Sequence, residues 1–172
     1  QIRAPIIIVG GGLTAVDAAC ESQEYYFTQI KKFKKRYKEI VNKFGEENFL
    51  NTLSDEEKII SKEFNNHCEI LESVGKEGLL KIIGRTKILY RKNLINSQSY
   101  KLNHEELIHA FEQGIEFIEN EEIDEIILDD FNYIKQIRSK NKIIHNCKSL
   151  LYAIGTNPNI SIVEEDKVSV DL

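Results

Sequence analysis

The pattern of apolar and polar residues at the start of the 172-residue chain predicts a buried strand followed by a long helix. Residues 6–9 are four consecutive β-branched residues, a run typical of a strand buried on both faces of a parallel sheet. From Tyr26 to Phe44, apolar residues recur at spacings of three and four. We therefore expect one amphipathic helix that begins near residue 13 and ends at Gly45, since glycine is a common helix terminator.

A second long helix is predicted after a short polar loop. Ser54 and Glu57 have the spacing of a capping box, in which each side chain satisfies a free backbone N–H at the helix start. The helix should end at Gly75 and Gly78. Its apolar face comprises Ile60, Phe64, His67, Leu71 and Val74. Because two amphipathic helices joined by a short loop pack antiparallel, residues 22–83 are interpreted as an inserted helical hairpin.

The remainder of the chain has shorter apolar runs separated by turns. The expected strands are residues 86–90, 115–118, 123–128, 133–138, 143–147 and 150–154. A short helix over 107–111, capped by Asn103 with Glu106 three residues on, should end at Gly114. The three runs between 123 and 147 predict an antiparallel meander, after which 150–154 returns to a buried sheet.

Three glycines follow the first strand directly, and they carry the main functional signal. Gly10, Gly12 and Ala15 form the Gly/Ala variant of the dinucleotide-binding fingerprint, with Gly11 between the two glycines. In this motif the first glycine permits a tight turn, the second lets a pyrophosphate approach the backbone, and the small third residue allows close helix packing. The free N–H groups at the helix start would point at the phosphates. We expect a dinucleotide to bind here; the alternative is a tight turn that binds no ligand.

Two basic residues, Arg91 and Lys92, follow the second predicted strand of the parallel sheet. In dinucleotide-binding folds an acidic residue at this place binds the ribose 2′-hydroxyl of NAD, whereas basic residues pair with the 2′-phosphate of NADP. The sequence therefore favours NADPH, with NADH still possible, because exposed basic residues at loop starts are common.

A further turn, from Gly155 to Pro158, ends the last predicted strand. Open α/β sheets bind ligands at the carboxyl ends of their strands, so Gly155 is a third candidate cofactor contact.

The sequence indicates no catalytic side chain and no metal site. His67 lies on an apolar helix face, where a histidine with a satisfied hydrogen bond is more common than a ligand. His104 and His109 have no nucleophile or carboxylate at a spacing that suggests a triad. The three cysteines are widely separated and form no C-x-x-C, so we expect buried free thiols.

Composition narrows the classes of partner. The net charge is −5 and the sequence pI is near 5.5, so nothing overall attracts the chain to nucleic acid. The apolar runs are too short to span a bilayer and no leader pattern precedes them, so a cytoplasmic location without membrane attachment is expected.

One segment of the first long helix is strongly basic, in contrast to the acidic chain as a whole. It contains Lys31, Lys32, Lys34, Lys35, Arg36, Lys38 and Lys43. A solvated helix surface is the favoured interpretation, with an acidic or nucleic-acid partner as the alternative.

These motifs together resemble a known family. The order is Val-Gly-Gly-Gly-Leu-Thr-Ala-Val-Asp, Leu-Tyr-Arg-Lys, His-Glu-Glu-Leu with Gln-Gly-Ile-Glu-Phe, a meander, and Ala-Ile-Gly-Thr-Asn-Pro-Asn. It is similar to the NADPH-binding domain of the small-subunit type of glutamate synthase, in the pyridine nucleotide-disulfide oxidoreductase superfamily. The resemblance implies an α/β, Rossmann-like FAD/NAD(P)-binding domain with a parallel sheet, a β-meander crossover and the helical hairpin as an insert.

The resemblance also implies a function. NADPH would pass hydride to FAD held by another domain, and the partner would be that FAD domain or an electron-acceptor subunit. By position, Gly10, Gly12, Leu13 and Thr14 would lie at the pyrophosphate, and Gly155 would lie where the chain returns toward the flavin. Arg91 and Lys92 would meet the 2′-phosphate, although Lys92 replaces the usual second arginine and weakens two-point phosphate recognition.

The expected organisation is a nucleotide domain at 1–21 and 84–160, the insert at 22–83, and a tail at 161–172. Because the chain begins at Gln1 and contains no methionine, we expect a fragment of a larger flavoprotein that is not active alone. Two rival hypotheses remain open: a non-catalytic nucleotide-binding remnant, and an interaction module that uses the helical hairpin.

Overall fold

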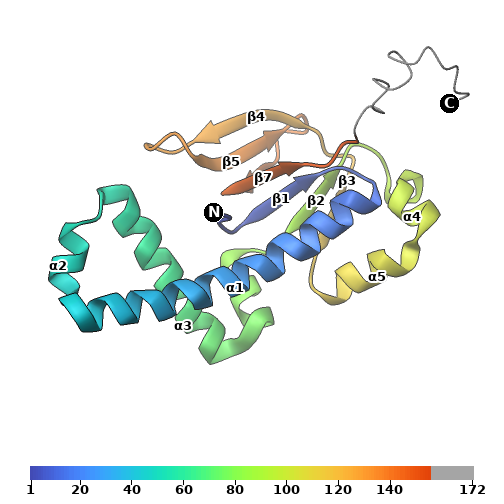
Figure 1. Cartoon of the computed structure of the whole chain (residues 1–172). Coiled ribbons are helices and arrows are strands. Elements are labelled where there is room, and N and C mark those ends of the chain that lie inside the picture. The colour runs from blue at the N-terminus through green and yellow to red at the C-terminus, as the bar shows by residue number, and fades with distance from the viewer. Residues whose placement is uncertain (156–172) are drawn as a thin grey trace, which may run out of the picture.

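A computed structural model describes residues 1–155 of the chain, and it has two sheets (Figure 1). The first is parallel, with strand order β3-β2-β1-β7, and the second is antiparallel, with order β4-β5-β6. The strands are β1 (Ile6–Val9), β2 (Lys87–Tyr90), β3 (Glu116–Glu119), β4 (Ile123–Leu128), β5 (Ile134–Ser139), β6 (Ile144–Asn146) and β7 (Ser149–Tyr152). The parallel sheet has the strand order of a Rossmann-like domain, with the chain returning beside β1 after the third strand. The predicted α/β class and the antiparallel meander are therefore confirmed.

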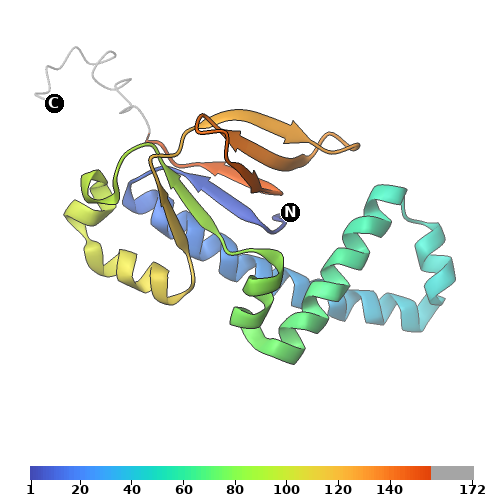
Figure 2. The same cartoon turned by 180° about the vertical axis from the view of Figure 1, so that it is seen from behind.

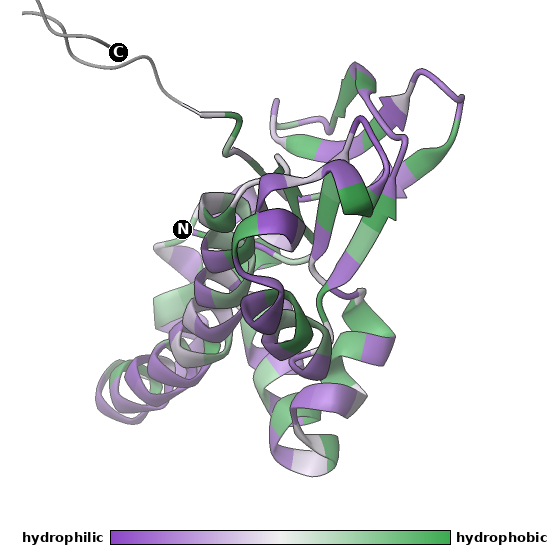
Figure 3. Cartoon of the chain, turned by 90° about the vertical axis from the view of Figure 1, so that its right-hand side faces the viewer, coloured by the Kyte–Doolittle hydropathy of each residue, from purple (hydrophilic) through white to green (hydrophobic). Residues whose placement is uncertain are grey.

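The helices are α1 (Leu13–Phe44), α2 (Glu46–Asn51), α3 (Asp55–Ile83), η1 (Leu94–Asn96), α4 (Gln98–Leu102) and α5 (His104–Glu112). Helix α1 covers one face of the parallel sheet and extends beyond it, and the meander covers the other face (Figures 1 and 2). Hydrophobic and hydrophilic residues form alternating bands along the helices and strands, as elements with one buried face require (Figure 3).

Alternate residues of the central strand β1 enter two different cores. Ile6 and Ile8 join the larger core with α1 and α5, whereas Ile7 packs with Leu89 and Ile137 under the meander. This division explains why the strand is apolar throughout: Ile6, Ile7 and Ile8 are buried on both faces, and Val9 beside the glycine turn is half-buried.

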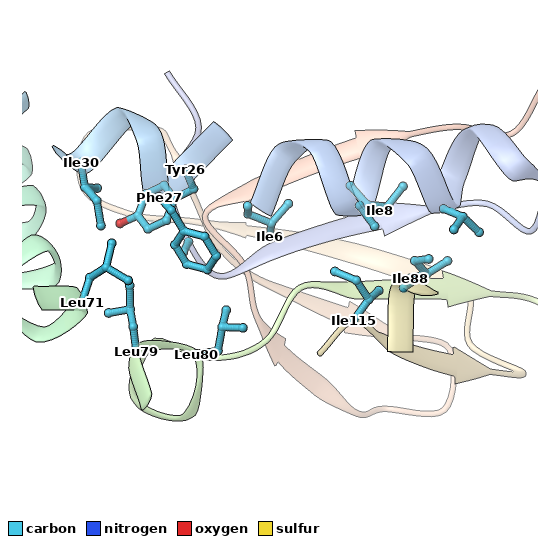
Figure 4. Close-up of a cluster of buried hydrophobic side chains, with 14 of the residues drawn as sticks. Ile6, Ile8, Tyr26, Phe27, Ile30, Leu71, Leu79, Leu80, Ile88 and Ile115 are labelled. Carbon is cyan, nitrogen blue, oxygen red and sulfur yellow. The ribbon is translucent and has the colours of Figure 1, made fainter. Parts of the chain in front are cut away.

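The helical hairpin shares the larger core with the sheet. Tyr26, Phe27 and Ile30 of α1 point toward Leu71 and Leu79 of α3, and the same cluster continues to Ile6 and Ile8 (Figure 4). Because this core is continuous, the hairpin is not a separately packed unit. The residue limits proposed for the insert stay a prediction.

Two ion pairs made by Glu63 attach α3 to the sheet. The Glu63 carboxylate lies 2.7 Å from the Arg3 guanidinium ahead of β1 and 2.6 Å from the Lys148 ammonium ahead of β7. The Glu63 side chain is only 10% exposed, and these cations hold its pKa below the ordinary value against the opposing effect of burial. The hairpin is thus tied to the amino-terminal ends of two neighbouring strands.

The capping box predicted at the start of α3 is confirmed, but the end of α3 and the cap of α5 differ from the predictions. Ser54 and Glu57 form both bonds of the capping box, but α3 passes a break at Gly75, where φ is +73°, and continues to Ile83. Asn103 precedes α5 as expected, yet its side-chain amide donates to Glu106 instead of accepting from the helix backbone. Strand limits differ from the predicted ones by a few residues, and α2, η1 and α4 were not predicted.

Candidate nucleotide site

The glycine turn lies at the carboxyl end of β1, where the first residue must be glycine. A Cβ atom on Gly10 would lie 2.3 Å from the Ala153 carbonyl oxygen and 3.0 Å from the Ala15 Cβ. The Gly10 N–H donates to the Leu89 carbonyl at 3.1 Å, which fixes the turn against β2. Gly10 therefore has no room for a side chain, and Ala15 packs directly against it.

The start of α1 has an open amino-terminal end. Gly12 is the N-cap, so no side chain caps the helix, and the first turn contains no acidic residue. The Gly12 carbonyl accepts from the Ala15 and Val16 N–H groups at 3.0 and 3.4 Å. Thr14 is exposed, Leu13 is half-buried, and a Cβ on Gly12 would have Gln98 Oε1, at 3.7 Å, as its nearest neighbour. The positive end of the helix dipole is thus accessible to an anion.

The middle glycine is covered by a side chain that the sequence did not single out. A Cβ on Gly11 would lie 2.3 Å from the Tyr90 ring, which also packs edge-on against Phe117. The Ser99 N–H and hydroxyl donate to the Gly11 carbonyl at 3.1 and 3.2 Å. The segment from β2 to α4 therefore packs against Gly11; Gly11, Gly12 and Leu13 are all half-buried, and Thr14 is exposed.

Arg91 and Lys92 directly follow β2 and are both exposed. Strands β1 and β2 are parallel neighbours, so these side chains and the glycine turn share the carboxyl edge of the sheet. The Lys92 carbonyl accepts from the Asn120 N–H at 3.3 Å, which ties the start of this loop to the end of β3. The pKa of Glu122 is lowered first by its bond to Lys140, and Arg91 adds a smaller favourable interaction.

Gly155 follows β7 and lies at the same edge. Ala153 donates from its N–H to the Val9 carbonyl at 2.8 Å, while its own carbonyl faces Gly10. Gly155 is exposed and has a φ of +97°, a conformation that favours glycine. The rest of this predicted turn, 156–158, lies outside the described residues. The predicted cofactor contacts thus lie together at the carboxyl edge of the parallel sheet: residues 10–14, Arg91, Lys92 and Gly155.

The histidines and cysteines lie elsewhere. His67 Nδ1 is 2.6 Å from the Tyr26 hydroxyl, so it has the satisfied hydrogen bond expected of a core histidine. Burial raises the pKa of Cys147 to about 11, which keeps its thiol protonated near neutral pH. Cys68 and Cys147 are buried free thiols as predicted, but Cys20 is only half-buried. Among residues 1–155, no three His, Cys, Asp or Glu side chains gather closely enough to hold a metal ion.

The basic cluster of α1 is an exposed surface with one exception. Lys34 is buried, and its ammonium pairs with Glu72 at 2.9 Å and Glu69 at 3.6 Å on α3. This lysine therefore joins the two helices and is not part of the outer face. No helix in the described part of the chain has an apolar stretch sufficient to cross a bilayer.

The fold and the edge geometry define a Rossmann-like α/β protein with a glycine turn suited to an anionic group. No protein-family model matches the chain. A relative in Rickettsia prowazekii (strain Madrid E), the uncharacterized protein RP006, is 37% identical over 198 residues, covering 98% of this chain and 26% of that protein. The chain thus spans about a quarter of the length of this relative.

Distant similarity to solved structures also covers nearly the whole chain. A ferredoxin reductase from Rhodopseudomonas palustris aligns over 96% of this chain and 27% of its own, with a TM-score of 0.49 and 8% identity. Putidaredoxin reductase, in its covalent complex with putidaredoxin, aligns over 96% and 27%, with a TM-score of 0.47 and 9% identity. The reduced CoADR-RHD of Bacillus anthracis aligns over 97% and 19%, with a TM-score of 0.43 and 12% identity.

Proposed function

We propose that the chain is the NADPH-binding part of a cytoplasmic, flavin-dependent oxidoreductase of the glutamate synthase small-subunit type. The observation that supports this most is the turn from Gly10 to Thr14, which leads from a central parallel strand into a helix without a side-chain cap. An uncapped helix start with no acid in its first turn is suited to a pyrophosphate, because its N–H groups and dipole both favour negative charge.

The residues divide the binding task among them. Gly10 makes the turn possible, and the backbone N–H groups at Gly12, Leu13 and Thr14 would hold the pyrophosphate, with Gly11 fixed beneath Tyr90. Arg91 and Lys92 would pair with the 2′-phosphate at the end of β2. Gly155 would border the nicotinamide half at the end of β7. NADPH, when bound, supplies the hydride; we assign no acid, base or nucleophile to this chain.

The flavin would be supplied by another part of the protein or by a partner. We place FAD in a domain outside this chain, with that domain or an electron-acceptor subunit as the partner. The proposed division of this chain is a nucleotide-binding domain at 1–21 and 84–160 with the hairpin at 22–83 inserted. A chain that spans about a quarter of its relative's length leaves room for such a domain.

Charge reversal at Arg91 tests the cofactor choice. Arg91→Glu should weaken NADPH binding by about 1–3 kcal/mol, the scale of a lost charge-assisted contact, and leave NADH binding unchanged. The measurement is calorimetric titration of both nucleotides. Lys135→Glu is the matched control, because Lys135 is an exposed residue of β5 and gives the same change in net charge. Equal losses for NADPH and NADH, or equal losses in both variants, would reject the 2′-phosphate assignment.

A second candidate is an interaction module that uses the exposed basic face of α1. Lys31, Lys32 and Lys35 are exposed there, whereas the buried Lys34 is already paired. Deleting residues 22–83 is not a clean test, because the hairpin shares its core with the sheet. Combined Lys31→Glu and Lys35→Glu substitutions keep that core: on this hypothesis they abolish binding of an acidic partner, and on the oxidoreductase hypothesis NADPH affinity stays unchanged.

A further inference from the structure

The short helix α4 brings a side chain from a distant part of the sequence to the glycine turn. This helix lies beside the start of α1 (Figures 1 and 2). Gln98 is its first residue, and the Gln98 Oε1 atom lies 3.7 Å from the position that a Cβ on Gly12 would occupy. In the fingerprint the missing side chain of the second glycine is what lets a pyrophosphate approach the backbone. The Gln98 carboxamide therefore borders the proposed pyrophosphate position.

Two buried serines fix the backbone on either side of Gln98. Ser97 and Ser99 are both 0% exposed. The Ser97 hydroxyl accepts from the Tyr100 N–H at 3.1 Å, and Ser99 donates from its N–H and its hydroxyl to the Gly11 carbonyl at 3.1 and 3.2 Å. The two serine hydroxyl oxygens are 3.1 Å apart. The backbone of Gln98 thus has a defined position relative to the turn, which lowers the entropic cost of a ligand contact by its side chain.

These serine contacts account for the packing of α4 without the Gln98 side chain. The hydrogen bonds that join α4 to the turn come from Ser99, and those that cap the helix come from Ser97. Gln98 is exposed, in contrast to both of its neighbours. Its side chain therefore remains accessible to a ligand at the turn.

The chemistry of a carboxamide suits a contact with a phosphate oxygen. The group is neutral and has two N–H donors besides its acceptor oxygen. Rotation about the last side-chain bond exchanges Oε1 and Nε2, because this torsion has a broad energy profile. The NH₂ group can thus occupy the place beside Gly12 when an anion is present. A hydrogen bond to an ionised acceptor is also stronger than one between neutral groups.

We propose that Gln98 is a further cofactor-binding residue, whose side-chain NH₂ group donates a hydrogen bond to the dinucleotide pyrophosphate at Gly12. This inference rests on the proposed nucleotide-binding function and adds to it a contact from outside the fingerprint. NADPH and NADH share the pyrophosphate. Gln98 therefore contributes to the affinity for both nucleotides, whereas Arg91 distinguishes between them.

Calorimetric titration of the 172-residue chain with NADPH and with NADH tests the inference. Gln98→Ala should raise both dissociation constants about tenfold, the lower end of the range for a hydrogen bond to a charged group. Gln98→Glu should raise them further, because it places a carboxylate beside the pyrophosphate. Gln98→Lys should preserve or improve both affinities, since an ammonium also donates to phosphate.

Gln113→Glu is the matched control. Gln113 is an exposed glutamine between α5 and β3, so it lies at the amino edge of the sheet, opposite the glycine turn. This variant should change either dissociation constant less than twofold. Urea unfolding should give the same midpoint for Gln98→Ala as for the unchanged chain, because the side chain is exposed.

The outcomes separate this inference from the proposed function. If the unchanged chain binds NADPH and the Gln98→Ala and Gln98→Glu variants bind it equally tightly, the inference is wrong and the proposed function stands. If the unchanged chain binds neither nucleotide, both are wrong. Tighter binding by Gln98→Ala, or equal weakening by Gln98→Glu and Gln113→Glu, would also overturn the inference.

Discussion

The ion pairs of Glu63 predict a large loss of stability from a substitution that preserves the size of the side chain. Glu63→Gln removes the negative charge between Arg3 and Lys148, which lie at 2.7 and 2.6 Å. The Arg3 side chain is 14% exposed and the Lys148 side chain 34% exposed. The guanidinium would therefore stay largely buried without its counter-ion, whereas the ammonium can turn toward solvent.

These exposures set the magnitude. Breaking a buried pair by removing one partner costs about 3–5 kcal/mol. The partly exposed Lys148 pair resembles a surface pair, worth about 0–1 kcal/mol. Because the isosteric amide can still accept a hydrogen bond from Arg3, we expect an overall loss of roughly 2–4 kcal/mol in the free energy of unfolding.

Urea unfolding of the chain, followed by circular dichroism across pH, measures this loss. The pKa of Glu63 is lowered in the folded state, so its contribution is fully present above the ordinary carboxyl pKa of 4.5. It is lost as the pH falls through the lower, folded-state value. The substitution should therefore destabilise the chain near pH 7 and have a smaller effect below pH 4.5.

Glu122→Gln is the matched control. Glu122 pairs with Lys140 at 2.8 Å, but both side chains are more than half exposed, so the expected loss is much smaller than that of Glu63→Gln. Equal destabilisation by the two variants, or a Glu63→Gln effect that is the same at pH 3.5 and pH 7, would refute the reasoning from burial.

Further substitutions test the glycine turn and the hairpin. Gly10→Ala should lower the free energy of unfolding in urea by roughly 1–3 kcal/mol, because its Cβ would meet the Ala153 carbonyl. An unchanged unfolding midpoint would contradict this packing. Gly12→Ala makes no clash, because its Cβ has no neighbour nearer than 3.7 Å, so it should cost only the N-cap preference for glycine over alanine, about 1 kcal/mol or less in urea unfolding. It should also weaken NADPH binding measured by calorimetry, and unaltered affinity would argue against close approach of the pyrophosphate. Ser54→Ala should cost about 1 kcal/mol in thermal unfolding by removing the capping box, and Ser73→Ala on the same helix should cost less.

Where the sequence pattern reflected a single physical requirement, the fold could be predicted from it. The four β-branched residues 6–9 can be apolar throughout only if both faces are covered, and the structure covers one with α1 and the other with the meander. The three-and-four spacing after Tyr26 predicted the course of α1 to Gly45, because apolar residues at this spacing are typical of an amphipathic helix. The buried residues of α1 lie between Ala15 and Lys34, and Phe44 at its end is exposed.

The features that could not be predicted from the sequence depend on tertiary contacts. The path of α3 beyond Gly75 depends on Leu79 and Leu80, which are buried in the shared core, and a local glycine signal does not reveal such contacts. Tyr90 and Ser99 both contact Gly11, although they lie 79 and 88 positions further along the chain. No periodicity encodes that contact, although an aromatic residue at the end of the strand next to a glycine turn is a usable signal. Likewise, the spacing of the Lys-rich segment did not distinguish the buried Lys34 from its exposed neighbours.

The central claim is that a dinucleotide binds with its pyrophosphate at the turn between β1 and α1. The most direct test is an NADPH titration of the isotope-labelled chain that follows the backbone amides by nuclear magnetic resonance. We predict saturable shifts at Gly12, Leu13 and Thr14, accompanied by shifts at Arg91 that are smaller with NADH. Saturable binding without any shift at residues 10–14, or no binding at all, would contradict the claim.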